Sequence, residues 1–135
     1  MAIPLLGAVP QARYVLGAVR LFNGAATLFA TRPFGKRLGV DPDTSPAAVY
    51  ALRLFGIRTI YVGAELLLAR GAHLRHAVAV APAIHISDTV SAALAGAGGQ
   101  LPKKAARTAT IISSVNVLLS LLAWSPAKRR RSWIR

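Results

Sequence analysis

Apolar residues along this chain gather in four long stretches, separated by short segments rich in Pro, Gly, Lys and Arg. The hydrocarbon core of a bilayer is about 30 Å thick and needs about 20 helical residues to cross it. All four stretches meet that length, and they lack the period-2 alternation that is typical of half-buried strands. The pattern therefore predicts helices over about 11–30, 47–69, 73–96 and 105–124.

Residue types at the ends of these stretches agree with the predicted helix boundaries. Arg-Pro-Phe-Gly at 32–35 ends the first helix, and Thr-Ser-Pro at 44–46 places a capping residue and a proline where the second begins. The glycine-rich run 95–99 ends the third helix, and Trp-Ser-Pro at 124–126 ends the fourth. Because the connections are short, we expect one all-α domain over 1–135, an integral membrane antiparallel four-helix bundle.

Composition supports a membrane rather than water as the solvent of this chain. Hydrophobic residues make up 54% of the sequence and charged residues 16%, and the mean hydropathy is +0.48. Soluble domains carry about a quarter charged residues, so the class predicted here is an integral membrane protein. The sequence contains no cysteine, which excludes disulfides, thiol nucleophiles and Cys-ligated metal sites.

The net charge of +13 comes from 17 Lys and Arg against four acids. Soluble nucleic-acid binders cluster such charge on a hydrated face. Here the basic residues fall largely between the apolar stretches, as they do in loops beside membrane spans. We therefore expect a bilayer with anionic headgroups as the partner, and no nucleic acid.

The distribution of Lys and Arg between the two sides of the membrane predicts the orientation. The side with both termini and the 70–75 connection carries eight, and the opposite side six. This places both termini in the cytoplasm of a multi-pass plasma-membrane protein. Residues 125–135 are predicted to form a basic cytoplasmic tail, whose four consecutive cations at 128–131 would lie at headgroup level.

Seven ionisable or amide side chains fall inside the apolar stretches, where a charge costs about 2.5–3.5 kcal/mol at the centre of a span. Each predicted helix has one such residue near its midpoint, so we expect a polar interior that is shared by the four helices. The predicted polar core consists of Arg20, Arg53, Arg58, Glu65, His85, Asp88 and Asn116.

Helical spacing predicts how these groups meet. His85 and Asp88 lie three residues apart and share a face, and antiparallel packing brings Asp88 toward Arg58. Glu65 falls on the other side of the membrane centre, where Arg20 or Arg58 can approach it. The three arginines exceed the two acids by one charge, which would attract an anionic headgroup, a carboxylate or a quinone oxygen. Alternatively, the ion pairs serve only to fix helix register.

Other residues predict packing rather than chemistry. Gly17, Gly24 and Thr27 lie near the face of Arg20 and allow another helix to approach closely. His73 and His76 have no acid or cysteine near them in the sequence, so no metal site is predicted. Phosphate-binding loops, catalytic triads and haem-attachment motifs are also absent from the sequence, which does not favour an autonomous enzyme.

Arg20, Gly24, the segment 55–63 (FGIRTIYVG) and Asp88 resemble a family of unknown function made of small four-helix membrane proteins, and more distantly the DoxX-like superfamily. The family commonly has an acid directly after its Gly-x-Arg motif, where this chain has Thr59. The resemblance extends over about 13–123 and implies the four-helix fold. DoxX-like relatives are linked to quinone-coupled oxidoreductase assemblies, which implies a quinone and a membrane redox partner by analogy.

Three functions remain open from the sequence. The first is a non-enzymatic membrane protein whose polar core binds a lipid, another small amphiphile or a partner helix, including a second copy of the chain. The second is a quinone-binding accessory subunit of a membrane oxidoreductase, in which His85 and Asp88 handle protons. The third is a small transporter or proton-relay protein that uses Arg58, Glu65 and Asp88. No cofactor is predicted for the first of these, and a quinone is the ligand in the second.

Overall fold

The computed structural model describes residues 10–124, and this part of the chain contains five helices and no strand. The all-α prediction is confirmed. The four long helices begin and end within two residues of the predicted positions, and the predicted basic tail lies outside the described residues. The long helices are α1 (Pro10–Phe29), α3 (Pro46–Leu68), α4 (Gly71–Ala97) and α5 (Lys103–Ala123).

The short helix α2 (Thr31–Arg37) occupies the segment that was expected only to end the first helix. Its proline lies in the first turn, where a missing N–H removes no helical hydrogen bond. The hydroxyl of Thr31 donates to the carbonyl oxygens of Thr27 and Leu28, at 2.7 and 2.9 Å, across the break between α1 and α2. The first helix ends where it was predicted to end, and the short helix that follows was not predicted; Pro33 is compatible with the first turn of a new helix.

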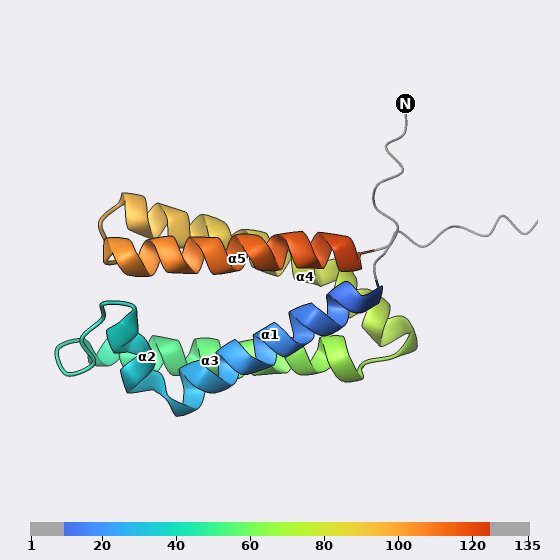
Figure 1. Cartoon of the computed structure of the whole chain (residues 1–135), viewed down its shortest axis with the longest axis horizontal. Coiled ribbons are helices and arrows are strands. Elements are labelled where there is room, and N and C mark those ends of the chain that lie inside the picture. Colours follow the sequence, from blue (N-terminus) through green and yellow to red (C-terminus); the bar gives the residue numbers. More distant parts are fainter. Residues whose placement is uncertain (1–9, 125–135) are drawn as a thin grey trace, which may run out of the picture.

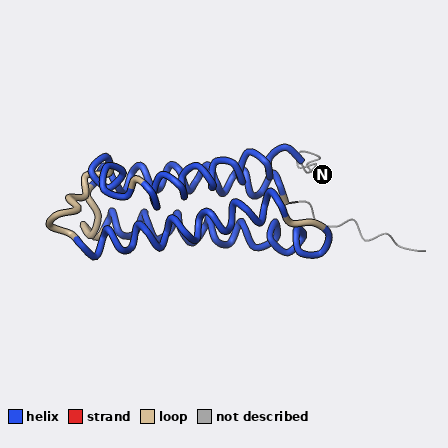
Figure 2. Tube along the Cα trace, turned by 90° about the horizontal axis from the view of Figure 1, so that it is seen from below, coloured by secondary structure: helices blue, strands red, loops and turns tan. Residues whose placement is uncertain are grey.

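The long helices form two antiparallel pairs. Figure 1 shows α1 crossing α3 in one pair and α5 lying along α4 in the other. Contacts between α1 and α5 and between α3 and α4 join the pairs, and Figure 2 shows the same side-by-side arrangement from below. The pairs lie close together near the α3–α4 connection and diverge toward the end that carries α2 (Figure 1).

Small residues bring the helices of each pair together. Gly17 and Gly24 on α1 face Gly63 and Gly56 on α3, and each glycine is close to the opposing backbone. The two glycines on each helix are seven residues apart, so they lie on one face two turns from each other. In the other pair, Gly96 of α4 lies against an alanine of α5. The close helix contact expected at Gly17 and Gly24 is present, and its partner is α3.

The described residues place polar groups inside and large apolar groups outside. Most buried hydrophobic residues are alanines, beside a small cluster of Leu16, Val62 and Leu66. The buried polar residues are Arg20, Thr27, Thr31, Thr59, His85, Asn116 and Ser120. Large apolar side chains are exposed on all four long helices, and α4 and α5 are long and apolar enough to cross a membrane. Many of the large apolar side chains of the long helices thus face outward.

Candidate functional site

A cavity of about 440 Å³ lies between the two helix pairs, and all five helices contribute to its lining. It extends from the end of the molecule that carries α2 toward the middle of the long helices. Along α5 the lining runs from Ala105 to Asn116, about 16 Å at the helical rise of 1.5 Å per residue. Its walls are mainly apolar, with large side chains from Phe34, Leu52, Phe55, Leu101 and Ile112.

The inner end of the cavity is polar, and each long helix supplies one side chain to it. We call this set the polar end: Arg20 of α1, Thr59 of α3, Asp88 of α4 and Asn116 of α5. Arg20, Thr59 and Asn116 are almost fully buried, with 2% or less of each residue exposed. Three members of the polar end, Arg20, Asp88 and Asn116, belong to the seven residues of the predicted polar core. The fourth, Thr59, was not predicted.

Asp88 is contacted by two arginines from the other helix pair. Its Oδ1 lies 2.5 Å from Nη2 of Arg58, and its Oδ2 lies 3.8 Å from Nη1 of Arg20. The predicted ion pair between Arg58 and Asp88 is present, but the expectation that Arg58 lies in the polar interior is wrong, because its side chain is half exposed. The two arginines differ in burial, because the Arg58 side chain is 51% exposed and that of Arg20 is 2% exposed. Arg58 therefore binds Asp88 from the surface, and Arg20 approaches it from the interior.

Several buried atoms of the polar end have no hydrogen-bond partner within residues 10–124. They are Nε and Nη2 of Arg20, Oγ1 of Thr59, Oδ2 of Asp88 and Oδ1 of Asn116. Buried polar atoms in folded proteins are nearly always hydrogen-bonded, and an unpaired one costs about 1–3 kcal/mol. These unpaired atoms therefore cluster at one end of an apolar cavity, and apolar walls with a few convergent polar groups are typical of small-molecule sites.

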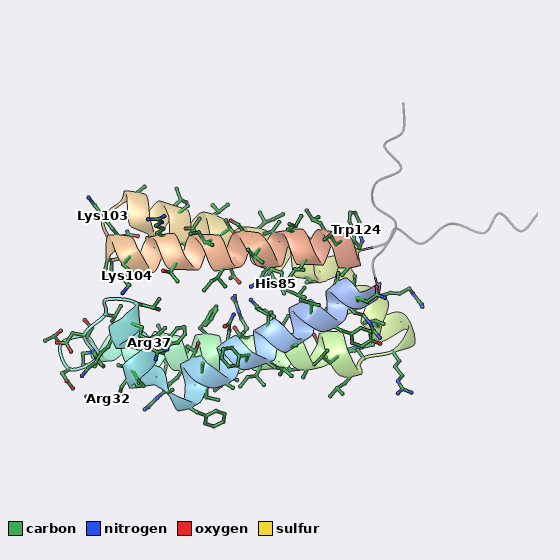
Figure 3. All side chains as sticks on the ribbon, in the orientation of Figure 1. Arg32, Arg37, His85, Lys103, Lys104 and Trp124 are labelled. Carbon is green, nitrogen blue, oxygen red and sulfur yellow. The ribbon has the colours of Figure 1, made fainter. Side chains whose placement is uncertain are left out.

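His85 lies beside this region but is absent from the cavity lining. It is fully buried, and Figure 3 shows its label between the two helix pairs. Neither ring nitrogen has a hydrogen-bond partner in the described part of the chain. His85 therefore adds to the polar interior without facing the cavity.

Arg53 and Glu65 lie apart from the polar end. Arg53 is exposed and does not line the cavity. Glu65 accepts a hydrogen bond from the Tyr61 hydroxyl at 2.9 Å, and its Oε1 also lies 2.9 Å from Nε2 of His73. The expected approach of Arg20 or Arg58 to Glu65 is not among the ion pairs of the described residues.

The expectation that no acid lies near His73 is also wrong. The chain reverses between α3 and α4 over Ala69 and Arg70, which returns His73 to the side of Glu65. These residues, with Tyr61 and His76, border a second pocket of about 330 Å³ near the α3–α4 connection. The sequence pattern did not predict this contact, because Glu65 and His73 are eight positions apart and lie on different helices.

Cations gather at the end of the molecule where the main cavity begins. We call them the cationic rim: Arg32, Lys36, Arg37, Lys103, Lys104 and Arg107. Figure 3 shows Lys103 and Lys104 at the end of α5 that lies beside α2, where Arg32 and Arg37 are labelled. The acids of this end are Asp41 and Asp43, and Asp43 pairs with Arg32. The rim therefore gives this end of the molecule an excess of positive charge.

The loop before α3 is organised by Asp41. Its carboxylate accepts hydrogen bonds from the backbone N–H of Asp43 and from the Thr44 hydroxyl, both at 3.1 Å. The bond from the Asp43 N–H and then that from Thr44 lower the pKa of Asp41 below that of an ordinary aspartate, with a smaller contribution from nearby Lys36 and Arg32. Asp41 thus remains ionised and holds the turn.

Thr59 is the member of the polar end that analysis of the sequence missed. It directly follows Arg58 in α3. A signal for its burial was present, because Gly56, Thr59 and Gly63 follow helical spacing and share one face of α3. Arg58, the charged residue beside it, is by contrast half exposed.

Comparisons with known proteins add no relative to this description: no family model, curated protein or solved structure matches the chain.

Proposed function

We propose that this chain is a multi-pass integral membrane protein in which the four long helices span the bilayer as an antiparallel four-helix bundle. The helices contain 20 to 27 residues, enough for the hydrocarbon core. Support also comes from their surfaces, where large apolar side chains are exposed on every long helix. Such a surface matches lipid, whereas in water it would drive aggregation.

The charges in α1 and α3 are compatible with spanning helices. Arg20 is buried beside Asp88, and Arg58 also pairs with Asp88. Arg53 lies about two turns from the start of α3, so its long side chain reaches the interface by snorkelling. Glu65 lies one turn from the end of α3, where His73 contacts it. Each of these four charged groups therefore has a partner or a route to the membrane surface.

We infer that the main cavity binds a small amphiphile, and that the protein acts as a binding protein rather than as an enzyme. The observation that carries this proposal is the set of buried, unpaired polar atoms within residues 10–124 at the inner end of an apolar cavity. A ligand with an apolar body and one polar group satisfies both parts of this site. The volume of the cavity, about 440 Å³, lies within the range of small-molecule pockets, about 300–1,000 Å³.

In the proposed orientation both termini are cytoplasmic and the cationic rim lies on the opposite face of the plasma membrane. The described chain begins and ends at the same end of the molecule (Figure 1), and the lining of the cavity includes residues at the other end, among them Leu38, Val40 and Leu101. A ligand therefore enters from the non-cytoplasmic face or from the lipid between the helix pairs.

A quinone-binding subunit is the alternative that the polar end also suits, because a quinone carbonyl oxygen accepts a hydrogen bond from the unpaired N–H groups of Arg20. The proposed likeness to DoxX-like proteins favours this alternative. A proton relay through Arg58, Glu65 and Asp88 has less support, because Glu65 contacts His73 and does not line the main cavity.

The test is native mass spectrometry of the full chain, extracted from membranes in mild detergent. We expect a small amphiphile to remain bound to the natural sequence. Ala109→Phe fills the cavity from α5 and should abolish this mass shift. The matched control is Ala18→Phe, because Ala18 is exposed on α1 and does not line the cavity. A bound quinone would favour the alternative, and equal ligand loads in all three proteins would refute a ligand role for the cavity.

A further inference from the structure

We propose that the ligand of the main cavity is a hydrophobic monocarboxylate, whose carboxylate binds Arg20 and whose apolar body fills the cavity toward the cationic rim. This inference rests on the proposed amphiphile-binding function and names the chemical class of the ligand. Three independent features of the described residues support it: the charge balance of the polar end, the free donors on Arg20 and the charge of the rim.

Arg20, Arg58 and Asp88 together carry one positive charge in excess. Arg20 and Arg58 lie against a single carboxylate, that of Asp88. Arg58 makes the shorter contact, 2.5 Å against 3.8 Å, and its half-exposed side chain also reaches the surface. Arg20 is buried and only distantly paired, and a buried charge without a close partner is costly. One ligand anion at this position makes the site neutral.

The geometry of Arg20 matches a carboxylate in particular. Its Nε and Nη2 both lack a hydrogen-bond partner among residues 10–124. A guanidinium donates from two nitrogens in a planar fork that fits the two oxygens of a carboxylate. Thr59 contributes a hydroxyl, whose hydrogen rotates to suit the ligand. A neutral carbonyl group has one oxygen and leaves part of this donor set unused.

The rest of the cavity accepts an apolar body and not a second charge. Its wall consists largely of aliphatic and aromatic side chains from α2, α3 and α5, and no lysine lines it. The cations instead lie at the cationic rim, around the end where the cavity begins. A positively charged rim raises the local concentration of anions and steers them to the opening. The anion then passes through the apolar part of the cavity and reaches the guanidinium of Arg20.

The experiment measures calorimetric binding of decanoate and decanol to the detergent-solubilised full chain. The two probes share an alkyl body and differ in the carboxylate. We expect decanoate to bind the natural sequence at least tenfold more tightly than decanol. Arg20→Gln should weaken decanoate binding by roughly tenfold to hundredfold, as for the loss of a charge-assisted hydrogen bond, and leave decanol binding nearly unchanged.

Two further variants make the result decisive. Arg53→Gln is the matched control, because it removes an exposed arginine outside the cavity and should leave both affinities unchanged. Ala109→Phe should abolish binding of both probes by filling the cavity. Should Arg20→Gln fail to fold, the decanoate-to-decanol ratio of the natural sequence and the Ala109→Phe result still decide the inference.

The outcomes separate this inference from the proposed function. Equal affinities for decanoate and decanol, both lost in Ala109→Phe, would overturn the carboxylate and leave the amphiphile-binding function standing. If neither probe binds and the purified protein also carries no amphiphile, both proposals fail. Decanoate binding that Arg53→Gln reduces as much as Arg20→Gln would show a general charge effect and would also overturn the inference.

Discussion

Gly24 of α1 and Gly56 of α3 lie backbone to backbone at the crossing of these two helices. A Cβ atom built on Gly24 would lie 2.9 Å from the carbonyl oxygen of Gly56, and one built on Gly56 would lie 3.0 Å from that of Gly24. Real Cβ atoms essentially never come closer than 3.0 Å to such neighbours. The close packing of α1 on α3 therefore depends on the absence of side chains at both positions.

Gly56→Ala is expected to destabilise the protein. The new methyl group would lie 2.9 Å from the backbone nitrogen of Leu28, which cannot move aside without displacing α1. Overpacking of this kind costs about 1–3 kcal/mol, which exceeds the gain of about 1 kcal/mol or less in helix propensity from Gly to Ala. Thermal unfolding followed by circular dichroism in detergent measures the change.

The control for this substitution is Gly35→Ala in α2. A Cβ atom there would lie 3.4 Å from the Leu52 side chain, which is an ordinary contact. We expect its unfolding temperature to equal or exceed that of the natural sequence. A Gly56→Ala protein as stable as Gly35→Ala would contradict the proposed importance of the close crossing.

Asp88→Asn is expected to be more destabilising than Arg58→Gln. Removing the Asp88 charge leaves Arg20 buried without an ionic partner, and breaking a buried pair in this way costs about 3–5 kcal/mol. Removing Arg58 leaves Asp88 paired with Arg20, so no buried charge loses its last partner and we expect the smaller loss of stability. Free energies of unfolding of the two variants in the same detergent provide the comparison.

The double variant Arg20→Gln with Asp88→Asn tests the reason for this order. Because it removes both buried charges, it should be more stable than Asp88→Asn alone. If the double variant is instead less stable than Asp88→Asn alone, the unpaired charge of Arg20 is not the cause of the stability lost in Asp88→Asn.

Asp41 is expected to titrate below the pKa of an aspartate in an unfolded chain. Hydrogen bonds from the Asp43 N–H and the Thr44 hydroxyl favour its charged form. A lowered folded-state pKa means that the contribution to stability is present above the unfolded-state pKa and is lost as the pH falls through the folded-state pKa. NMR titration of the Asp41 carboxyl carbon measures this pKa. Thr44→Ala removes one donor and should raise the pKa, whereas no change would show that Thr44 has no role.

Topology is open to direct measurement because the sequence contains no cysteine. Single cysteines at Lys103 and Arg37 should react with a membrane-impermeant maleimide from one face of the membrane, and a cysteine at His76 only from the other. The reason is that Lys103 and Arg37 lie at the cationic rim, whereas His76 lies near the α3–α4 connection. If the cysteines at positions 103 and 76 react from the same face of the membrane, the proposal of four spanning helices is contradicted.

The sequence by itself determined the number, type and approximate ends of the long helices. Long, largely apolar stretches that lack period-2 alternation and have Pro, Gly and cations between them leave few alternatives to helices. It also determined that Asp88 meets Arg58, because helical rise and antiparallel packing place the two at similar depth. These features depend on the spacing of residues along the chain and on its overall hydrophobicity, and both can be read from a single sequence.

Only the tertiary structure decided which face each polar residue presents. Helices that are apolar on most sides have no strong sequence signal for their rotation, so Thr59 is buried while Arg58 beside it is half exposed. Rotation is set by the close approach of Gly24 to Gly56, which fixes the α1–α3 contact. The pairing of Glu65 with His73 likewise depends on the turn between α3 and α4. Contacts between helices, and not the pattern along any one of them, assemble the polar end of the cavity.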